Sequence, residues 1–400
     1  MSKGNGILRY LEEIGVKVPK EKLSVVQKEL DDYAEKATDR FSRYLGYPNG
    51  LMGGFLPDKV INMLLLNIGG PQENGYKAPN THDYEIEAIE FLKGVFHFPA
   101  DRKEWGGGVT GSTEGVLSGV LNMRNLLKSK SSIEPVVIAS SEAHYCAAKS
   151  AYITGLEFHP VVADSNGSMR LDELKHLLQR LGGRPIIVIA TVETTVKGGY
   201  DNIDEISKLL DAHDAPGFIH VDAALAGLVA PFIDDVKDPY KPRFSPRVQS
   251  ISVSLHKFLC SNRPSAMVLG LKPEGIKNPL AEQVAYINAT DATVAGSRNG
   301  HSFMAFSCLT RLLGTEGLSK MANVCYGNAK YLAQSLRKGG VHVVHNPGAL
   351  TVYFPRPSPE IVDKYTLACD GDGAHAITMQ HVNKELIDDF VTDYLQWHEN

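Results

Sequence analysis

The sequence predicts an α/β protein with a mostly parallel sheet covered by helices, followed by a small α+β lobe at the carboxyl end. From about Phe91, short apolar runs alternate with amphipathic segments, which is the pattern of β-α-β units. The run 186–190 (Ile-Ile-Val-Ile-Ala) is β-branched at nearly every position, which is typical of a strand buried on both faces. After about Gly300, strands and helices separate instead of alternating, and this favours the α+β lobe.

The composition is that of an ordinary globular chain of 400 residues, with 43% hydrophobic and 22% charged residues. The net charge of −5, from 41 basic and 46 acidic residues, argues against a general nucleic-acid binder. We expect no membrane span, because no run of about 18 apolar residues occurs. Five cysteines without CxxC spacing fit neither a disulfide framework nor a zinc finger. Together with a start that lacks a secretory apolar region, they favour the cytoplasm.

The apolar spacing predicts three parts: a helical segment over 1–60, a large α/β domain over 61–300 and a small α+β domain over 301–400. In the first part, Leu23, Val26 and Leu30 recur at helical steps, and Gly46 with Pro48 ends the pattern. A loop-rich stretch follows over 47–82. In the large domain, strands are predicted at 136–139, 186–190 and 218–221, with helices at 171–181 and 203–210. In the last part, the pattern predicts a helix over 304–336, strands at 341–344, 350–354 and 376–379, and a closing helix with Leu386, Phe390 and Tyr394 on one face.

Polar side chains follow several of these strands where each strand ends. Asp222 ends the strand 218–221, the threonines at 191, 194 and 195 follow the strand 186–190, and the segment 252–257 adds serines, a histidine and a lysine. In open α/β sheets, ligands bind beyond the carboxyl ends of the strands. The sequence therefore predicts a site at this edge of the sheet.

Lys257 and Asp222 are the two candidates for covalent and electrostatic chemistry there. Apolar neighbours of Lys257 favour its neutral amine, which can attack a carbonyl, although a surface lysine in a loop is an equally simple interpretation. Asp222 is followed by small residues including Ala224, which leave room for a flat ring whose protonated nitrogen the carboxylate would pair with. The alternative for Asp222 is a helix N-cap.

The segment 106–115 (Gly-Gly-Gly-Val-Thr-Gly-Ser-Thr-Glu-Gly) leads into an amphipathic helix. Glycine turns and hydroxyls at a helix amino terminus form an anion cradle, with a surface loop as the alternative. A GxGxxG match can be made at Gly106, Gly108 and Gly111, but the preceding residues do not indicate a strand. A monophosphate therefore fits better than a dinucleotide or ATP.

Other catalytic patterns are weaker. His144 could stack on a ring or carry a proton, or it could be a packed core histidine. No HExxH or CxxC pairing indicates a metal site. A hydrolase triad of His220, Asp222 and Ser254 lacks the GxSxG turn.

The order of these segments resembles the group II pyridoxal 5′-phosphate (PLP) decarboxylases of the aspartate-aminotransferase fold class (fold type I). The segments are the glycine and Ser/Thr loop, His-Tyr at 144–145, Thr-Thr at 194–195, HVDAA at 220–224 and SxHK at 254–257. The likeness runs from about Asn67 to Val391 and is greatest to bacterial histidine decarboxylases, with plant serine decarboxylases nearby. The hexapeptide 296–301 (Gly-Ser-Arg-Asn-Gly-His) is particularly similar to that branch. The resemblance implies a seven-stranded, mostly parallel sheet and a homodimer with sites at the subunit interface.

The resemblance also implies roles for individual residues. Lys257 would hold PLP, Asp222 would keep the ring nitrogen protonated, and His144 would stack on the ring and border the substrate. Tyr286 would protonate the α-carbon, and Ser297 with Arg298 would border the substrate pocket. The other cofactor contacts implied are Gly111, Ser112, Thr113, Thr195, Ala224, Ser254 and His256.

The sequence departs from the family pattern near the site. Glu193 and Leu255 each replace a glycine, Ser112 replaces the second glycine of a pair, and 67–71 lacks an acidic residue. These changes leave the substrate open. We expect decarboxylation of L-histidine to histamine, with decarboxylation of serine or another amino acid, transamination, and PLP binding without catalysis as alternatives.

Overall fold

The computed structural model describes residues 64–71, 80–274 and 281–399, and a few single residues before them: Lys20, Glu21, Ser24, Val25, Lys28, Arg43, Leu45 and Val60. Apart from these single residues, the helical segment expected over 1–60 and most of the loop-rich stretch 47–82 lie outside the described residues.

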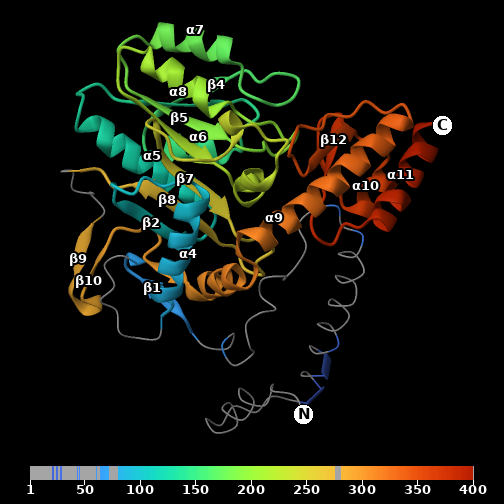
Figure 1. Cartoon of the computed structure of the whole chain (residues 1–400), viewed down its shortest axis with the longest axis horizontal. Coiled ribbons are helices and arrows are strands. Elements are labelled where there is room, and N and C mark those ends of the chain that lie inside the picture. Colours follow the sequence, from blue (N-terminus) through green and yellow to red (C-terminus); the bar gives the residue numbers. More distant parts are fainter. Residues whose placement is uncertain are drawn as a thin grey trace.

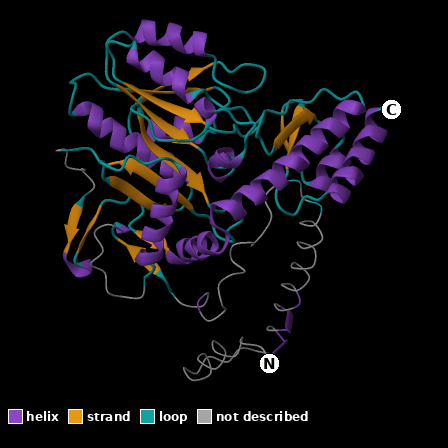
Figure 2. Ribbon diagram, in the orientation of Figure 1, coloured by secondary structure: helices purple, strands orange, loops and turns teal. Residues whose placement is uncertain are grey.

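A seven-stranded sheet forms the centre of the large domain, in the order β2-β8-β7-β6-β5-β3-β4 (Figures 1 and 2). Strand β8 is antiparallel to both of its neighbours, and the other neighbouring pairs are parallel. This confirms the predicted fold class. The strands are β2 (Glu104–Val109), β3 (Val136–Ser140), β4 (Glu157–Val161), β5 (Ile186–Thr191), β6 (Gly217–Asp222), β7 (Val248–Ser254) and β8 (Ala266–Leu271).

Helices cover both faces of this sheet, as its apolar strands require. On one face, α5 (Ser112–Lys128) and α6 (Cys146–Ile153) pack against alternate residues of β3 and β5. On the other face lie α4 (His82–Val95), α7 (Leu171–Leu181) and α8 (Ile203–Asp211). All six residues of β5 are buried, as its β-branched composition predicts.

The three glycines 106–108 belong to strand β2, whereas the sequence pattern placed them in a turn. They are required by close packing: a Cβ on Gly108 would lie 1.8 Å from the ring of Phe303, and one on Gly106 would lie 2.1 Å from the carbonyl oxygen of Val268. Gly106 also has a φ of +119°, which favours glycine. The expected anion cradle therefore reduces to the turn from Thr110 to Thr113.

The carboxyl-terminal lobe contains a three-stranded antiparallel sheet in the order β12-β14-β13, with two helices. These elements are β12 (Thr351–Pro355), α10 (Pro359–Tyr365), β13 (Ala368–Asp370), β14 (Gly373–Ile377) and α11 (Lys384–His398). The strands predicted at 350–354 and 376–379 correspond to β12 and β14. The strand predicted at 341–344 is wrong, since only Val344 pairs, through an isolated bridge to Tyr353.

Helix α9 (Gly300–Lys338) joins the two parts and bends at Gly314, where φ is +58° (Figure 1). Its first half packs in the core of the large domain, through residues such as Phe303 and Phe306. Its last turns pack in the lobe, through Leu332 and Leu336. The division expected at residue 300 thus falls at the start of a helix that both parts share.

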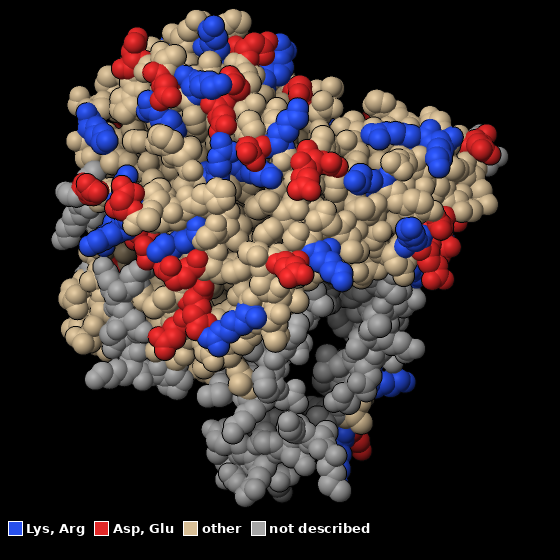
Figure 3. All heavy atoms as spheres, in the orientation of Figure 1, with Lys and Arg blue, Asp and Glu red and all other residues tan. Residues whose placement is uncertain are grey.

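Two small antiparallel pairs lie beside the large domain. One joins β1 (Leu66–Ile68) to β11 (Ser297–Asn299), and the other joins β9 (Glu282–Val284) to β10 (Ala289–Asp291) through the short helix η6 (Ala285–Ile287). Acidic and basic side chains are intermixed over the face shown in Figure 3. Among the described residues, none of the helices combines the length and the apolar character that crossing a bilayer requires.

Candidate active site

A cavity of about 620 Å³ opens at the carboxyl ends of β5, β6 and β7, where the sequence predicts a site. It brings together most of the predicted residues, although they come from separate parts of the chain. Those that line it are Gly111, Ser112, Thr113, His144, Thr195, Asp222, Ala224, Ser254, His256 and Lys257.

One end of the cavity is suited to an anion. The hydroxyl oxygens of Ser112 and Ser254 lie 2.8 Å apart, at the point where α5 begins. The N-cap residue of this helix is Gly111, which has no side chain to accept from the N–H groups of the first turn, and the first helical residues Ser112 and Thr113 line the cavity. A Cβ on Gly111 would have only His256 nearby, at 4.0 Å, and the space beside it is therefore open. A phosphate group suits such a helix amino terminus.

Asp222 lies at the end of β6 and is 4% exposed. Its Oδ1 accepts a hydrogen bond from the backbone N–H of Ala224 at 3.2 Å, and its Oδ2 accepts one from the thiol of Cys146 at 3.6 Å. Burial, reinforced by the charge of Asp222, raises the pKa of Cys146, which keeps the thiol protonated as a donor. Sequence reasoning missed Cys146, although its position two residues after His144 was a usable signal.

His144 lies in the same cavity as a neutral imidazole. Burial lowers its pKa, and the Asp222 carboxylate opposes this effect only in part. Its Nδ1 accepts a hydrogen bond from the backbone N–H of Cys146 at 3.2 Å, so the ring hydrogen lies on Nε2. The ring also lies 4.0 Å from that of Tyr145, centroid to centroid.

Lys257 follows His256 directly after β7. Its charge acts on the pKa values of His144, His256 and Glu193, which places the amine within electrostatic reach of all three. The Nδ1 of His256 is 2.8 Å from the carbonyl oxygen of Ser265, and burial lowers the pKa of this histidine. The lysine therefore lies among neutral imidazoles and near two carboxyl groups.

Three predicted site residues lie elsewhere. Tyr286 is 83% exposed in η6, and Ser297 is exposed in β11; neither lines this cavity. Arg298 is only 2% exposed, because it neutralises the buried Glu85 and donates to the carbonyl oxygens of Gly108 and Gly69.

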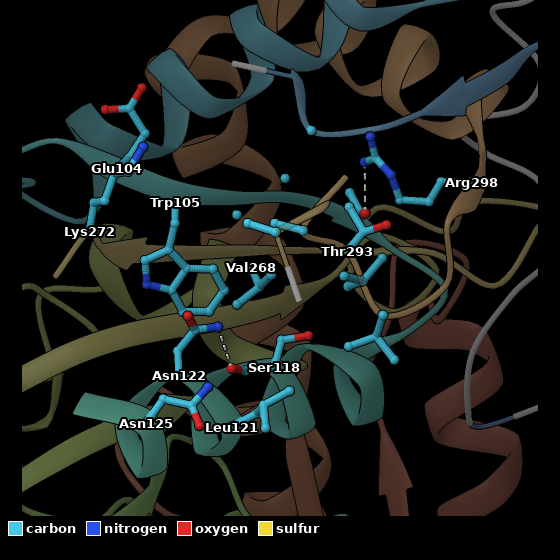
Figure 4. Close-up of a pocket in the computed structure, with 18 of the residues that line it drawn as sticks. Glu104, Trp105, Ser118, Leu121, Asn122, Asn125, Val268, Lys272, Thr293 and Arg298 are labelled. Atoms are coloured by element: carbon cyan, nitrogen blue, oxygen red, sulfur yellow. Dashed lines mark hydrogen bonds between the residues drawn. The ribbon is translucent and has the colours of Figure 1, made fainter. Parts of the chain in front are cut away.

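Arg298 instead lines a second cavity of about 250 Å³ beside β2 and α5. Figure 4 shows it across this cavity from Trp105 and Asn122. That Ser297 and Arg298 border the substrate pocket therefore stays a prediction, and the cavity that Arg298 lines in the described chain is not the one that Lys257 lines. The physical reason is that a buried arginine pairs with the nearest buried carboxylate.

Comparison with known proteins gives the family. Residues 56–355 match the model of the pyridoxal-dependent decarboxylase conserved domain. The chain belongs to the pyridoxal-dependent decarboxylase family. Relatives of this decarboxylase include serine decarboxylase 3 of Oryza sativa subsp. japonica, which is 32% identical over 89% of this chain and 78% of its own length. They also include the histidine decarboxylase of Morganella morganii, which is 32% identical over 88% of this chain and 92% of its own.

Among solved structures, the L-methionine decarboxylase of Streptomyces sp. 590 superposes with a TM-score of 0.81, at 22% identity and over 96% of both chains. At this identity the match shows the fold, and it agrees with fold type I.

The residues of the cavity fit PLP, the cofactor of this decarboxylase. The serine hydroxyls at the start of α5 suit its phosphate, the Asp222 carboxylate suits its ring nitrogen, and the Lys257 amine suits its aldehyde. Ala224 also lines the cavity, and its small side chain would leave space for the ring. A PLP-dependent amino-acid decarboxylase needs this combination of groups.

Proposed function

We propose that this decarboxylase converts L-histidine to histamine and CO₂. The main support for decarboxylation is that Lys257, Asp222 and His144 line one cavity in a chain of this family. Support for histidine comes from the hexapeptide 296–301 and from the histidine decarboxylase relatives.

We assign the following roles to the residues of the cavity. PLP held in this cavity would supply an acceptor for the electron pair of the bond between the α-carbon and the carboxylate. Asp222 holds a proton on the ring nitrogen, and the donors from Ala224 and Cys146 fix the orientation of its carboxylate. Ser112 and Ser254, with Gly111, Thr113 and Thr195 around them, hold and orient the cofactor.

Lys257 and His144 would act closest to the reacting carbon. Lys257 holds the cofactor between turnovers, and its amine accepts or releases protons as substrate enters and product leaves. His144 would lie against the cofactor ring and, being neutral with its hydrogen on Nε2, would add no second positive charge to the cavity.

Tyr286 remains our proposed acid for protonating the α-carbon. It is exposed and does not line the cavity of its own chain. Its role therefore requires that the hairpin β9–β10 moves or that it serves the cavity of a second copy. We propose the second arrangement, a homodimer with its sites at the subunit interface.

A hybrid dimer tests this arrangement. Chains carrying Lys257→Ala and chains carrying Tyr286→Phe are each nearly inactive under the proposal. A mixed dimer regains activity if Tyr286 serves the partner's cavity, because one cavity then has both groups. Mixed dimers as inactive as both parents would instead mean that Tyr286 serves the cavity of its own chain. A Tyr286→Phe enzyme with unchanged amine output would remove Tyr286 from the mechanism.

Serine is the second candidate substrate. Serine decarboxylase 3 of rice has the same 32% identity to this chain as the histidine decarboxylase of Morganella morganii. The two identities therefore do not separate the two substrates.

The deciding experiment presents the PLP-loaded enzyme with a mixture of L-histidine, L-serine, L-glutamate, L-methionine and aromatic amino acids. We expect L-histidine to disappear while histamine and CO₂ appear in equal amounts, with an Asp222→Asn variant as the slow control. Ethanolamine as the main product would identify L-serine, and not L-histidine, as the substrate. Keto acid without CO₂ would indicate transamination, and bound cofactor with no product from any amino acid would indicate a binding protein.

A further inference from the structure

Two residues with an unfavourable backbone conformation lie where the carboxyl-terminal lobe meets the cavity. Glu193 has a φ of +72° and Cys260 a φ of +54°, values that side chains with a Cβ rarely adopt. Glu193 is two residues before Thr195, and Cys260 is three residues after Lys257. Strained residues persist only where surrounding contacts hold them, and they gather at functional sites.

The contacts that hold Glu193 come from the lobe. Its Oε1 accepts three hydrogen bonds, from the backbone N–H of Leu350 at 2.9 Å and from the backbone N–H and hydroxyl of Thr351 at 2.9 and 2.8 Å. The hydroxyl of Tyr200, in the large domain, lies 3.5 Å from its Oε2. A carboxylate that is 6% exposed thus joins the start of β12 to the wall of the cavity.

A second contact joins the lobe to the segment that carries Lys257. The amide nitrogen of Gln380 donates to the carbonyl oxygen of Phe258 at 2.6 Å, and the thiol of Cys260 lies 3.2 Å from the side-chain oxygen of Gln380. The lobe is therefore attached on both sides of the cavity, at the segment of Thr195 and at the segment of Lys257.

The attachment at Glu193 has little freedom to slide. Gly198 closes the turn that follows Thr195, and a Cβ placed on it would lie 3.1 Å from the Cβ atoms of both Ala349 and Thr351. Backbone and side-chain donors of the lobe would lose their acceptor if Glu193 were removed, and burial makes such a loss costly.

We propose that Glu193 is a positioning residue, which clamps the segment of Thr195 to β12 and so sets the geometry of the cofactor cavity around Lys257. The chain here has glutamate where the family pattern it resembles has glycine. Glycine would relieve the backbone but could not bind the lobe. The clamp therefore explains why a strained side chain is kept at this position.

The test compares three substitutions at one residue in the full-length protein. Glu193→Gln keeps the Oε1 acceptor, Glu193→Ala removes it, and Glu193→Gly removes it while relieving the backbone. We expect the Kd for PLP to rise about tenfold or more in the Ala and Gly variants, in which all three donors of the lobe lose their acceptor, and to stay within about threefold in the Gln variant. The pH titration of the visible absorption band of bound PLP should shift in the same two variants.

Tyr326→Phe is the matched control. It removes another hydrogen bond between α9 and the large domain, from the Tyr326 hydroxyl to Asp235 at 2.7 Å, and Tyr326 does not line the cavity. We expect it to lower the melting temperature without changing the Kd for PLP. If the Ala variant does not fold, Thr351→Val removes one of the three bonds and should raise the Kd about threefold.

Two results would overturn the proposal. One is a Kd for PLP within about twofold of wild type in both the Gly variant and Thr351→Val. The other is an equal rise in Tyr326→Phe, since the cavity would then respond to any loss of stability. No amino acid is added in these measurements, so the outcome is independent of which substrate the enzyme uses.

Discussion

Two polar clusters of this protein contain a cation and a buried carboxylate each, and they behave in opposite ways. Beside β2, Arg298 pairs with Glu85, which also accepts hydrogen bonds from the backbone N–H of Gly108 at 2.6 Å and from the amide of Asn67 at 2.8 Å. At the carboxyl ends of β5 to β7, Asp222 and Lys257 instead line a cavity of about 620 Å³.

The difference shows that burial and charge do not identify a site by themselves. In the first cluster the charges are used by the fold, because each bonds to the other and to backbone groups. In the second cluster they border open space, where a ligand can complete their interactions. Arg298 also borders a cavity, so open space alone does not separate the two clusters, and the closed ion pair of Arg298 with Glu85 is what marks the first cluster as structural.

The largest expected effect tests the open cluster, which is Asp222 and Lys257 at the larger cavity. Lys257→Ala should lower kcat by about 10³-fold or more, because the variant loses the amine that holds the cofactor. Among the described residues that line the cavity, the one other lysine is Lys149, on α6. Borohydride reduction of the wild-type enzyme should leave a pyridoxyl label on the peptide that contains Lys257. A label on another lysine, or full activity in the variant, would contradict the assignment of the cavity.

The next effect tests the closed cluster, which is the ion pair of Arg298 with Glu85. Glu85→Gln leaves a buried guanidinium without its carboxylate, and it should lower the free energy of unfolding by about 3–5 kcal/mol. Urea denaturation measures this loss. The double variant Glu85→Leu/Arg298→Met should recover part of it, because apolar side chains of similar size need no partner.

The Kd for PLP should change little in the folded fraction of both variants. If an Arg298 variant instead raised KM for the substrate and kept its stability, Arg298 would belong with the substrate pocket, as the family resemblance implies.

Arg298 also shows where sequence reasoning stops. Strands such as β5 and β6 could be predicted because their apolar residues form a continuous local run. Asp222 and Lys257 could be predicted as site residues because they lie at or after the ends of such strands. The partner of Arg298 is 213 residues away in sequence, and no local pattern indicates that pairing. The glycines of β2 were misplaced for the same reason, since the ring that requires Gly108 belongs to Phe303.

A smaller effect is expected at Glu193, which lines the cavity and bonds to the lobe, and it concerns the pH dependence of stability. Burial raises its pKa from 4.5 to about 7, although the bonds from Thr351 and Leu350 and the charge of Lys257 oppose this. The folded state thus binds more protons than the unfolded state in this window. The stability that protonated Glu193 contributes is therefore complete below pH 4.5 and is lost as the pH rises through about 7.

Glu193→Gln removes this dependence. Relative to wild type, the variant without cofactor should gain unfolding free energy as the pH rises from about 4.5 to about 7, by a few kcal/mol, and remain constant above that. Denaturation midpoints of both proteins across this range measure the difference. Tyr200 and Lys257 face the same carboxyl group, and parallel pH profiles would show that Glu193 does not titrate there.

The smallest effect concerns Cys146, whose thiol donates a hydrogen bond to Asp222 of the open cluster. Its thiol is a weak donor at 3.6 Å from Asp222 Oδ2, so its loss in Cys146→Ala should cost about 1 kcal/mol or less. Cys146→Ser supplies a stronger donor of similar size and should stabilise the ionised carboxylate. Because Asp222 faces the ring nitrogen, the two substitutions should shift the pH titration of the bound cofactor's absorption band in opposite directions, each by less than about one unit. Shifts in the same direction would mean that Cys146 acts by packing, and the fixed orientation of Asp222 would then rest on the backbone N–H of Ala224 alone.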